Sequence, residues 1–307
     1  MPKIALPDGS ERVYENPVTA AQIAADIGPG LAKAALAAVV NDENWDINRV
    51  IEEDCTLRLI TAKDDACLEL IRHDCAHILA EAVLELYPET QVTIGPAIES
   101  GFYYDFYREK PFSIDDLDAI EKRMHDIVDR NEEIIRGEWS RDEAVEFYKK
   151  RNEPFKVELV EAIPANETVS YYAQGAFIDL CRGPHMASTK KAGHAFKLMK
   201  VAGAYWRGDS NNPMLQRIYG TAWTTEADLQ AYLTMLEEAE KRDHRKLGKA
   251  LNLFHMQEEA TGSIFWHPNG WTLYREIENY VRRRLDAADY QEVKTPQMID
   301  RSLWEAS

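Results

Sequence analysis

The chain has 307 residues, 45% of them hydrophobic, and a formal net charge of −17. This length predicts two or three domains, and the apolar fraction is high enough for buried cores and argues against a disordered chain. The sequence contains neither a run of about 20 apolar residues that could span a bilayer nor a secretory signal after Met1, and its four cysteines favour reduced thiols in a cytoplasmic protein over a disulfide framework.

Residues 1–62 are predicted to form a small β-rich domain of the ubiquitin-like β-grasp type. Asp8-Gly9 favours a hairpin turn because both residues tolerate a positive φ, and Thr19 is a suitable N-cap for a short helix. The predicted elements are a strand at residues 4–6, a turn at 7–10, a helix from 19 to 25 that Gly28-Pro29-Gly30 ends, and strands at 36–40 and 57–61. We expect little catalytic chemistry from this domain.

Residues 63–224 are predicted to form a second domain of the α+β class. Apolar residues recur at helical period from Ile71 to Tyr87, and Pro88 follows, which predicts a helix over residues 68–87. The other predicted elements are hairpin strands at 93–98 and 102–106, an acidic helix at 114–131 capped by Ser113, and strands at 156–160 and 177–181.

The rest of the chain is predicted to be a linker helix followed by the start of another domain. Residues 225–251 are predicted to form one strongly charged helix that Thr225 caps. Residues 252–307 contain a predicted helix at 272–285, a strand that ends at Pro296 and a helix that begins after Asp300. Because the chain stops inside that last helix, we expect Ser307 to be a cut and not a natural terminus.

The negative net charge repels nucleic acid, so RNA binding would require a local basic surface. Between Met186 and Gly220 the chain has six basic residues and a single acidic one, Asp209. A solvated basic face is the usual explanation of such a segment, and charge alone therefore does not predict an RNA-binding site.

Two groups of histidine and cysteine carry the chemistry of the second domain. His73 and His77 are four residues apart on a predicted helix, so that their rings project from one face and can share a metal ion or a water molecule. Asp179 and Cys181 share one face of a predicted strand, and Gly183-Pro184 can turn the chain so that His185 returns towards Cys181. Together these residues predict either a zinc site with nitrogen and sulfur ligands or a polar pocket that orients a water molecule.

These two motifs, His73-Asp74-Cys75-Ala76-His77 and Asp179-Leu180-Cys181-Arg182-Gly183-Pro184-His185, resemble the signatures of the editing domain of the threonyl-tRNA synthetase family, which alanyl-tRNA editing enzymes share in part. Five further segments, at residues 196–200, 203–209, 216–223, 243–248 and 265–271, resemble the threonyl family in particular. Residues 1–62 are similar to the TGS domain at the front of that family. The resemblance extends over essentially the whole chain in collinear order.

The resemblance implies a role for eight residues. His73, His77, Cys181 and His185 would line the editing pocket, which in the family is generally understood to work without zinc although the ligands suit that metal. Lys156 and Asp179 would orient the catalytic water and the terminal ribose, and Gly95 and Tyr104 would contact the terminal adenosine or the seryl group. We expect His73 or Lys156 to position or activate the water, and we favour this route over a nucleophilic Cys181.

The resemblance also implies what the parent protein does. It would charge tRNA(Thr) with threonine as a homodimer, using ATP, Mg and one Zn through residues beyond Ser307, while residues 252–307 would supply only the beginning of a class II catalytic core with its motif 1. An active site separates serine from threonine by only about 1–3 kcal/mol for the missing methyl group, so that a second site is needed to hydrolyse seryl-tRNA(Thr). We expect this segment to contain that second site and not to form threonyl-adenylate.

Three alternatives stay open at this point. The chain could be a freestanding deacylase that acts in trans, an alanyl-type editing module that binds zinc, or a non-enzymatic RNA-binding or regulatory module built on residues 1–62. Metal analysis distinguishes the second alternative, and absence of seryl-tRNA hydrolysis would favour the third.

Overall fold

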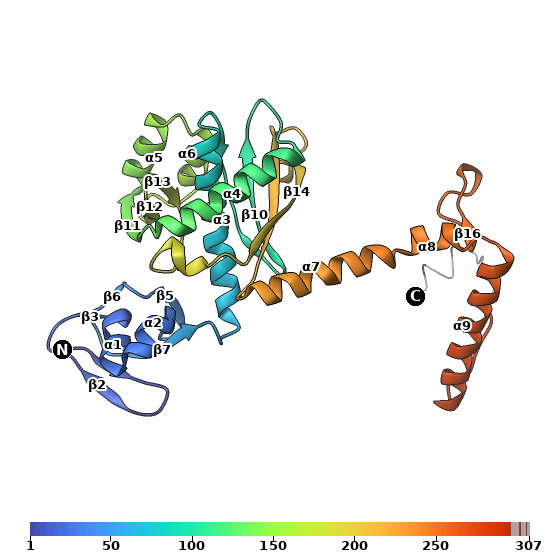
Figure 1. Ribbon diagram of the computed structural model, residues 1–307, viewed down its shortest axis with the longest axis horizontal. Helices are drawn as coiled ribbons and strands as arrows, with labels where there is room; N and C mark the ends of the chain where they lie inside the picture. Colours follow the sequence, from blue (N-terminus) through green and yellow to red (C-terminus); the bar gives the residue numbers. More distant parts are fainter. Residues whose placement is uncertain (296–300, 302–304, 306–307) are drawn as a thin grey trace. The chain divides into compact units, whose positions relative to one another are not determined.

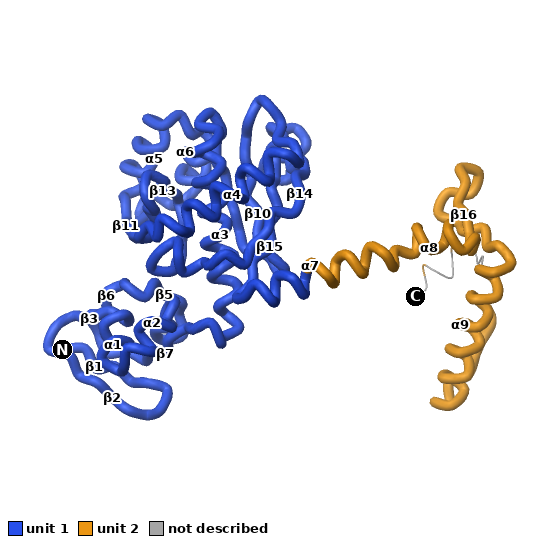
Figure 2. The backbone as a smooth tube through the Cα atoms, in the orientation of Figure 1, with its two compact units in different colours: residues 1–232 blue, residues 233–307 orange. Residues whose placement is uncertain are grey.

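The computed structural model describes residues 1–295, Arg301 and Glu305, and the chain divides into two compact units, residues 1–232 and 233–307 (Figure 1; Figure 2). Helices and several separate sheets are mixed in the first unit. The predicted α+β class is therefore confirmed.

The first 61 residues form a five-stranded sheet of order β2-β1-β7-β4-β5, hereafter the N-terminal sheet, with β1 parallel to β7 and the other neighbours antiparallel. A parallel central pair between two hairpins, with a helix against the sheet, is the β-grasp arrangement. The elements are β1 (Lys3–Ala5), β2 (Glu11–Val13), β3 (Val18–Thr19), α1 (Ala20–Ile27), α2 (Pro29–Ala34), β4 (Ala35–Val40), β5 (Glu43–Asp46), β6 (Val50–Ile51) and β7 (Cys55–Thr61).

Local signals in this segment act largely as predicted. Thr19 caps α1 in a capping box, since its side chain accepts from the Gln22 backbone at 3.2 Å and the Gln22 side chain accepts from the Thr19 backbone at 2.9 Å. Gly28 ends α1, but Pro29 and Gly30 do not prolong the break. They open the short helix α2 instead, because proline suits the first position of a helix, where no N–H partner is lost.

Two further sheets make up the rest of the first unit, in the orders β14-β15-β10-β8, with β9 beside β10, and β11-β12-β13. The elements are α3 (Ala66–Leu86), β8 (Gln91–Val92), β9 (Ala97–Ile98), β10 (Gly101–Tyr107), α4 (Ile114–Arg130), β11 (Ile134–Ser140), α5 (Arg141–Lys150), α6 (Pro154–Glu161), β12 (Thr168–Gln174), β13 (Phe177–Leu180), β14 (Phe196–Tyr205) and β15 (Met214–Ala222), with 3-10 turns η1 (Thr189–Ala192) and η2 (Trp206–Gly208). Of these, α5, β11, β12 and the β14–β15 pair were not predicted.

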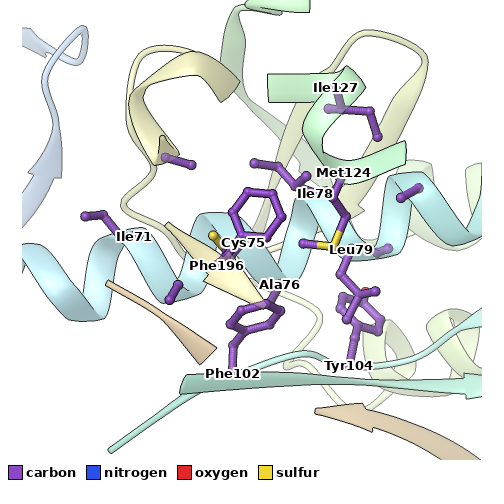
Figure 3. Close-up of a cluster of buried hydrophobic side chains, with 14 of the residues drawn as sticks. Ile71, Cys75, Ala76, Ile78, Leu79, Phe102, Tyr104, Met124, Ile127 and Phe196 are labelled. Atoms are coloured by element: carbon purple, nitrogen blue, oxygen red, sulfur yellow. The ribbon is translucent and has the colours of Figure 1, made fainter. Parts of the chain in front are cut away.

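Helix α3 is the centre of the first unit, because it packs against α4 and against β10 and β15 (Figure 1). Figure 3 shows its apolar side chains between aromatic residues of the sheet and the apolar face of α4. The labelled members of this core are Ile71, Cys75, Ala76, Ile78, Leu79, Phe102, Tyr104, Met124, Ile127 and Phe196. Since α3 is buried on most sides, each polar group along it needs a partner.

Two sequence predictions in this region are wrong. Residues 156–160 are not a strand but lie in α6, which begins with Pro154 at its first turn. A run of five partly β-branched residues fits a short strand as well as a buried helix turn, and the preceding proline was the better signal.

Only the last two residues of the predicted strand at 93–98 form a strand, β9, and β8 precedes the predicted range. Residues 93–96 stay hydrogen-bonded to β10, because Thr93 donates to the Asp105 carbonyl at 3.1 Å and Tyr103 donates to the Pro96 carbonyl at 3.3 Å. The ladder is irregular there, since Pro96 has no N–H to donate and a Cβ atom on Gly95 would stand 2.1 Å from Cδ2 of Tyr104.

Beyond β15 the described part of the chain forms helices and one short two-stranded sheet. The predicted single helix over 225–251 is two helices, α7 (Glu226–Lys241), which Thr225 caps as predicted, and α8 (His244–Ala250). Asp243 causes the break, because its carboxylate accepts from the Arg245 backbone at 2.8 Å and so starts a new helix. The remaining elements are β16 (Phe254–His255), η3 (Glu258–Ala260), β17 (Phe265–Trp266) and α9 (Pro268–Ala287).

The predicted helix at 272–285 lies within α9, whereas residues 293–295 are not a strand. Pro296 and most of the helix predicted after Asp300 lie outside the described residues. No helix in the described part of the chain is both long and apolar enough to cross a membrane.

Candidate active site

The site is built first from α3, which carries two histidines on one side. His73 and His77 lie one turn apart, with ring centroids 5.2 Å from each other and the rings nearly perpendicular. Asp74, the residue after His73, is fully buried. This face of α3 therefore presents two imidazoles and one carboxylate to the same side of the helix.

The second part of the site is the segment that leaves β13. Cys181 follows β13, and Gly183 adopts a φ of +73°, which favours glycine. A Cβ atom on Gly183 would also lie 1.9 Å from the Tyr172 hydroxyl. Glycine is thus required for the turn that brings His185 back, so that its Nε2 lies 3.3 Å from the Cys181 sulfur.

The structure brings the four predicted His and Cys residues together. The Cys181 sulfur lies 3.2 Å from His73 Nε2, and the ligand atoms of His73, His77, Cys181 and His185 all lie within 4.8 Å of one another. We call this group the His/Cys cluster. The cluster is assembled from residues more than 100 positions apart in the chain.

Asp74 controls the charge of the cluster. Its Oδ1 lies 2.7 Å from His185 Nδ1, and its Oδ2 accepts from the Met186 backbone at 3.1 Å. Burial alone would lower the pKa of His185, but the Asp74 carboxylate outweighs it and raises this pKa to about 10. His185 is therefore an imidazolium at neutral pH.

The other members respond to that charge. Burial opposes ionisation of Cys181, but hydrogen bonds from His185, His73 and His77 outweigh it and hold the pKa of the thiol well below its usual range. Burial and the charge of His185 lower the pKa of His77, whose ring is neutral at pH 7. The cluster thus contains a thiolate–imidazolium pair beside a neutral imidazole.

A second polar group, which we call the Lys156 triad, consists of Lys156, Tyr104 and Asp179, all buried. Lys156 pairs with Asp179 Oδ1, and the Tyr104 hydroxyl donates to Asp179 Oδ2 at 2.5 Å. Lys156 also donates to the Tyr104 oxygen at 3.2 Å. Burial and the Asp179 charge raise the pKa of Tyr104 well above its ordinary value, so the phenol keeps its proton.

A single cavity of about 620 Å³ connects the two groups. Its lining includes His73, His77 and Cys181 of the cluster, all three members of the triad, and Gly95. His185 does not line this cavity; it lies behind Cys181 and is buried. A volume of this size suits a small ligand or the end of a larger one.

The donor set of the His/Cys cluster fits a divalent zinc ion. Three imidazoles and one thiolate are ligands that zinc prefers, and the Asp74–His185 contact is the carboxylate support that ligating histidines commonly have. Binding would require His185 to lose the Nε2 proton that it shares with Cys181.

The sequence did not identify three residues that shape the site. Asp74 was part of a quoted motif but had no predicted role, and Asp46 and Tyr172 were not singled out. The Tyr172 hydroxyl and the His185 backbone both donate to Asp46, each at 2.8 Å. No local pattern signals these contacts, because they join segments far apart in the sequence.

Half of the six basic residues in the segment 186–220 form ion pairs. Lys197, Arg207 and Arg217 pair with the acids Glu121, Glu158 and Asp105 respectively. All three acids lie outside the segment, which explains why its own composition overstated its charge.

Two domain families and several full-length relatives match this chain. The TGS domain family matches residues 2–61, and the family described as threonyl and alanyl tRNA synthetase second additional domain matches residues 169–219, which include Asp179, Cys181 and His185. Over the whole chain, the threonine–tRNA ligases of Rhodospirillum rubrum and Paramagnetospirillum magneticum are each 62% identical and that of Rickettsia akari is 61% identical. The chain spans about half the length of these curated relatives, 48% of each. It therefore belongs to the threonyl-tRNA synthetase family, as a segment that contains the TGS domain and the second additional domain.

Proposed function

We propose that the cavity between the His/Cys cluster and the Lys156 triad hydrolyses seryl-tRNA(Thr), the mischarged product of a threonine–tRNA ligase. The observation that carries this proposal is the assembly of a cysteine sulfur, two imidazoles, an ammonium and a carboxylate around one cavity of about 620 Å³. Asp179, Cys181 and His185 lie in the segment that matches the second additional domain family.

Hydrolysis of an aminoacyl ester requires a positioned water, a group that accepts its proton and donors for the oxyanion that forms on the carbonyl carbon. His73 and Cys181 face the cavity and are hydrogen-bonded to each other, so either can accept the proton. We propose that His73 accepts the proton of the water, since the Cys181 thiolate is already stabilised by His185. Direct attack by the thiolate would add an acyl-enzyme step that hydrolysis does not need.

The Lys156 triad supplies the positive side of the cavity. The Lys156 ammonium is fixed by Asp179 and by Tyr104, so that it needs no reorganisation when negative charge develops on the ester carbonyl. Asp179 and Lys156 are also suited to hold the ribose hydroxyl beside the ester. Gly95 lies so close to Tyr104 that a Cβ atom would stand 2.1 Å from the ring, so a side chain at this position would displace a member of the triad.

If a zinc ion binds this chain, His73, His77, Cys181 and His185 would hold it, and it would polarise the ester or lower the pKa of a bound water.

We propose that the parent protein charges tRNA(Thr) with threonine, with ATP, Mg and Zn, as a homodimer, and that it works in the cytoplasm, where the four free cysteines of this chain stay reduced.

The test is a deacylation assay with seryl-tRNA(Thr) and threonyl-tRNA(Thr), carried out with and without a chelator. We expect the seryl ester to be cleared and the threonyl ester to be spared by at least about tenfold, the scale set by one methyl group. Replacement of His73 by Ala should abolish most of this activity. Absence of hydrolysis would exclude an editing enzyme, while loss of activity on chelation with zinc bound at the cluster would favour the alanyl-type alternative.

A further inference from the structure

One carboxylate of the N-terminal sheet makes direct contact with the loop that carries the His/Cys cluster. Asp46 is the last residue of β5, and its Oδ1 accepts from the His185 backbone N–H at 2.8 Å. Its Oδ2 accepts from the Tyr172 hydroxyl, also at 2.8 Å. The side chain of Asp46 is 14% exposed, so water competes little for these bonds.

The two bonds hold His185 from two directions. One fixes its backbone, and the other fixes Tyr172, whose ring lies 4.3 Å from the His185 ring, centroid to centroid. The imidazole is then held at Nδ1 by Asp74 and at Nε2 by Cys181. The orientation of His185, and with it the contact of its Nε2 with the Cys181 sulfur, therefore depends on a residue 139 positions earlier in the chain.

Asp46 does not line the cavity of about 620 Å³ and so touches no substrate there. We propose that Asp46 is a positioning residue of the hydrolytic site, which acts through His185 and the loop of residues 181–187. The proposal rests on the function proposed above, and it assigns the N-terminal sheet a part in the hydrolysis reaction.

A second contact between the same two parts of the chain distinguishes a positioning role of Asp46 from simple attachment of residues 1–61 to the rest of the first unit. Lys191 donates to the carbonyl of Lys33 in α2 at 2.8 Å, which also joins the second additional domain to the N-terminal domain, but this contact is exposed and does not reach the loop. Lys191→Ala is therefore a matched control for Asp46→Ala.

The first experiment measures hydrolysis of seryl-tRNA(Thr) by the full chain. We expect Asp46→Ala to lower kcat about tenfold or more with KM within about twofold, because misplacement of a catalytic group acts on the transition state. Asp46→Asn keeps one carbonyl oxygen for the His185 N–H and should recover part of the loss, and Lys191→Ala should leave kcat unchanged. Equal losses of kcat and Tm in Asp46→Ala and Lys191→Ala would overturn the proposal, as would an unchanged kcat in Asp46→Ala.

A double-mutant cycle tests whether Asp46 acts through His185. In a His185→Gln background, Asp46→Ala should lower kcat by less than about twofold, because the group that it positions is already absent. A full additional tenfold loss would show that Asp46 acts by another route and would overturn the proposal.

Amide hydrogen exchange keeps the test independent of activity. In the wild-type chain the His185 amide should be protected, and Asp46→Ala should accelerate exchange across residues 181–187 while exchange in α4 stays unchanged. If wild-type chain fails to hydrolyse seryl-tRNA(Thr), the proposed function fails, yet accelerated exchange would still support positioning of this loop. Unchanged exchange in Asp46→Ala would overturn the positioning itself.

Discussion

At the residue scale, the polar groups of the site depend on partners that are buried with them. Lys156 and Asp179 have side chains only 2% and 3% exposed, which neither would tolerate alone. Such a pair contributes little net stability compared with apolar residues of the same size, but the loss of one partner leaves an unpaired charge. The ion pair of Lys156 and Asp179 is better explained by its place in the lining of the cavity.

Lys156→Met should therefore lower both the stability of the fold and hydrolysis. We expect a loss of about 3–5 kcal/mol in unfolding free energy from denaturant titration, because Asp179 is left without its cation. The double variant Lys156→Met/Asp179→Asn should regain much of that stability while hydrolysis stays low. Recovery of hydrolysis in the double variant would show that the ammonium has no part in the reaction.

Glu81, on α3, gives the stability a dependence on pH. Burial, followed by the nearby Glu132 and Glu85, raises its pKa to about 8 despite the hydrogen bond from Gln174 at 2.6 Å. The folded chain thus holds a proton that the unfolded chain releases near pH 4.5, so stability falls as pH rises from about 4.5 to 8. Glu81→Gln should remove this fall and raise Tm at pH 8.5 by about 2 °C or more.

Glu85→Gln is the matched control, because the pKa of Glu85 is shifted in the opposite direction. Hydrogen bonds from Arg130 and Arg123 lower its pKa to about 2, so this carboxylate stabilises the fold at neutral pH. We expect Glu85→Gln to lower Tm at pH 7 in thermal scans. A rise of Tm at pH 7 in Glu85→Gln would contradict the assignment of both carboxylates.

At the scale of the element, caps were predicted well and short apolar runs were not. Thr19 and Ser113 cap α1 and α4 through hydrogen bonds between residues three positions apart. The residue types at these positions are therefore sufficient to predict the caps. The run of residues 156–160 lies in helix α6 because it packs beside α5, and the continuous helix predicted over 225–251 is broken by the competing cap at Asp243. Packing is decided outside the windows on which periodicity depends, whereas the cap at Asp243 is a local signal that periodicity alone does not include.

Ser113→Ala should destabilise α4 and, through it, the core around α3. The Ser113 side chain accepts from the Asp116 backbone at 3.3 Å, and the Asp116 carboxylate accepts from the Ser113 backbone at 2.7 Å. We expect a loss of about 0.5–2 kcal/mol in chemical denaturation, with Ser113→Thr close to wild type. If Ala and Thr cost the same, the cap contributes nothing to stability.

At the scale of the whole molecule, every residue assigned to the site lies in the first compact unit, from Asp46 to His185. None of the described residues of the second unit, which are 233–295, Arg301 and Glu305, lines the cavity of about 620 Å³. Hydrolysis should therefore depend on the first unit alone.

A chain that ends after Lys241, the last residue of α7, tests this independence. We expect its kcat for seryl-tRNA(Thr) in single-turnover assays to stay within about twofold of the full chain, since the preorganised groups are unchanged. Its Tm should match the unfolding transition of the first unit in the full chain. A loss of kcat at saturating enzyme would place a required group in residues 242–307.

Some features of this protein follow from its sequence alone, because they depend on short-range geometry. The spacing of His73 and His77, the turn at Gly183 and the caps of α1 and α4 are set by backbone periodicity and hydrogen bonds over a few residues. The tertiary structure alone decides the pairing of Asp74 with His185, of Lys156 with Asp179 and of Asp46 with the loop of residues 181–187, which span 111, 23 and 139 positions. Such pairings depend on how buried elements pack, because a buried charge requires a partner and the packing determines which group lies beside it.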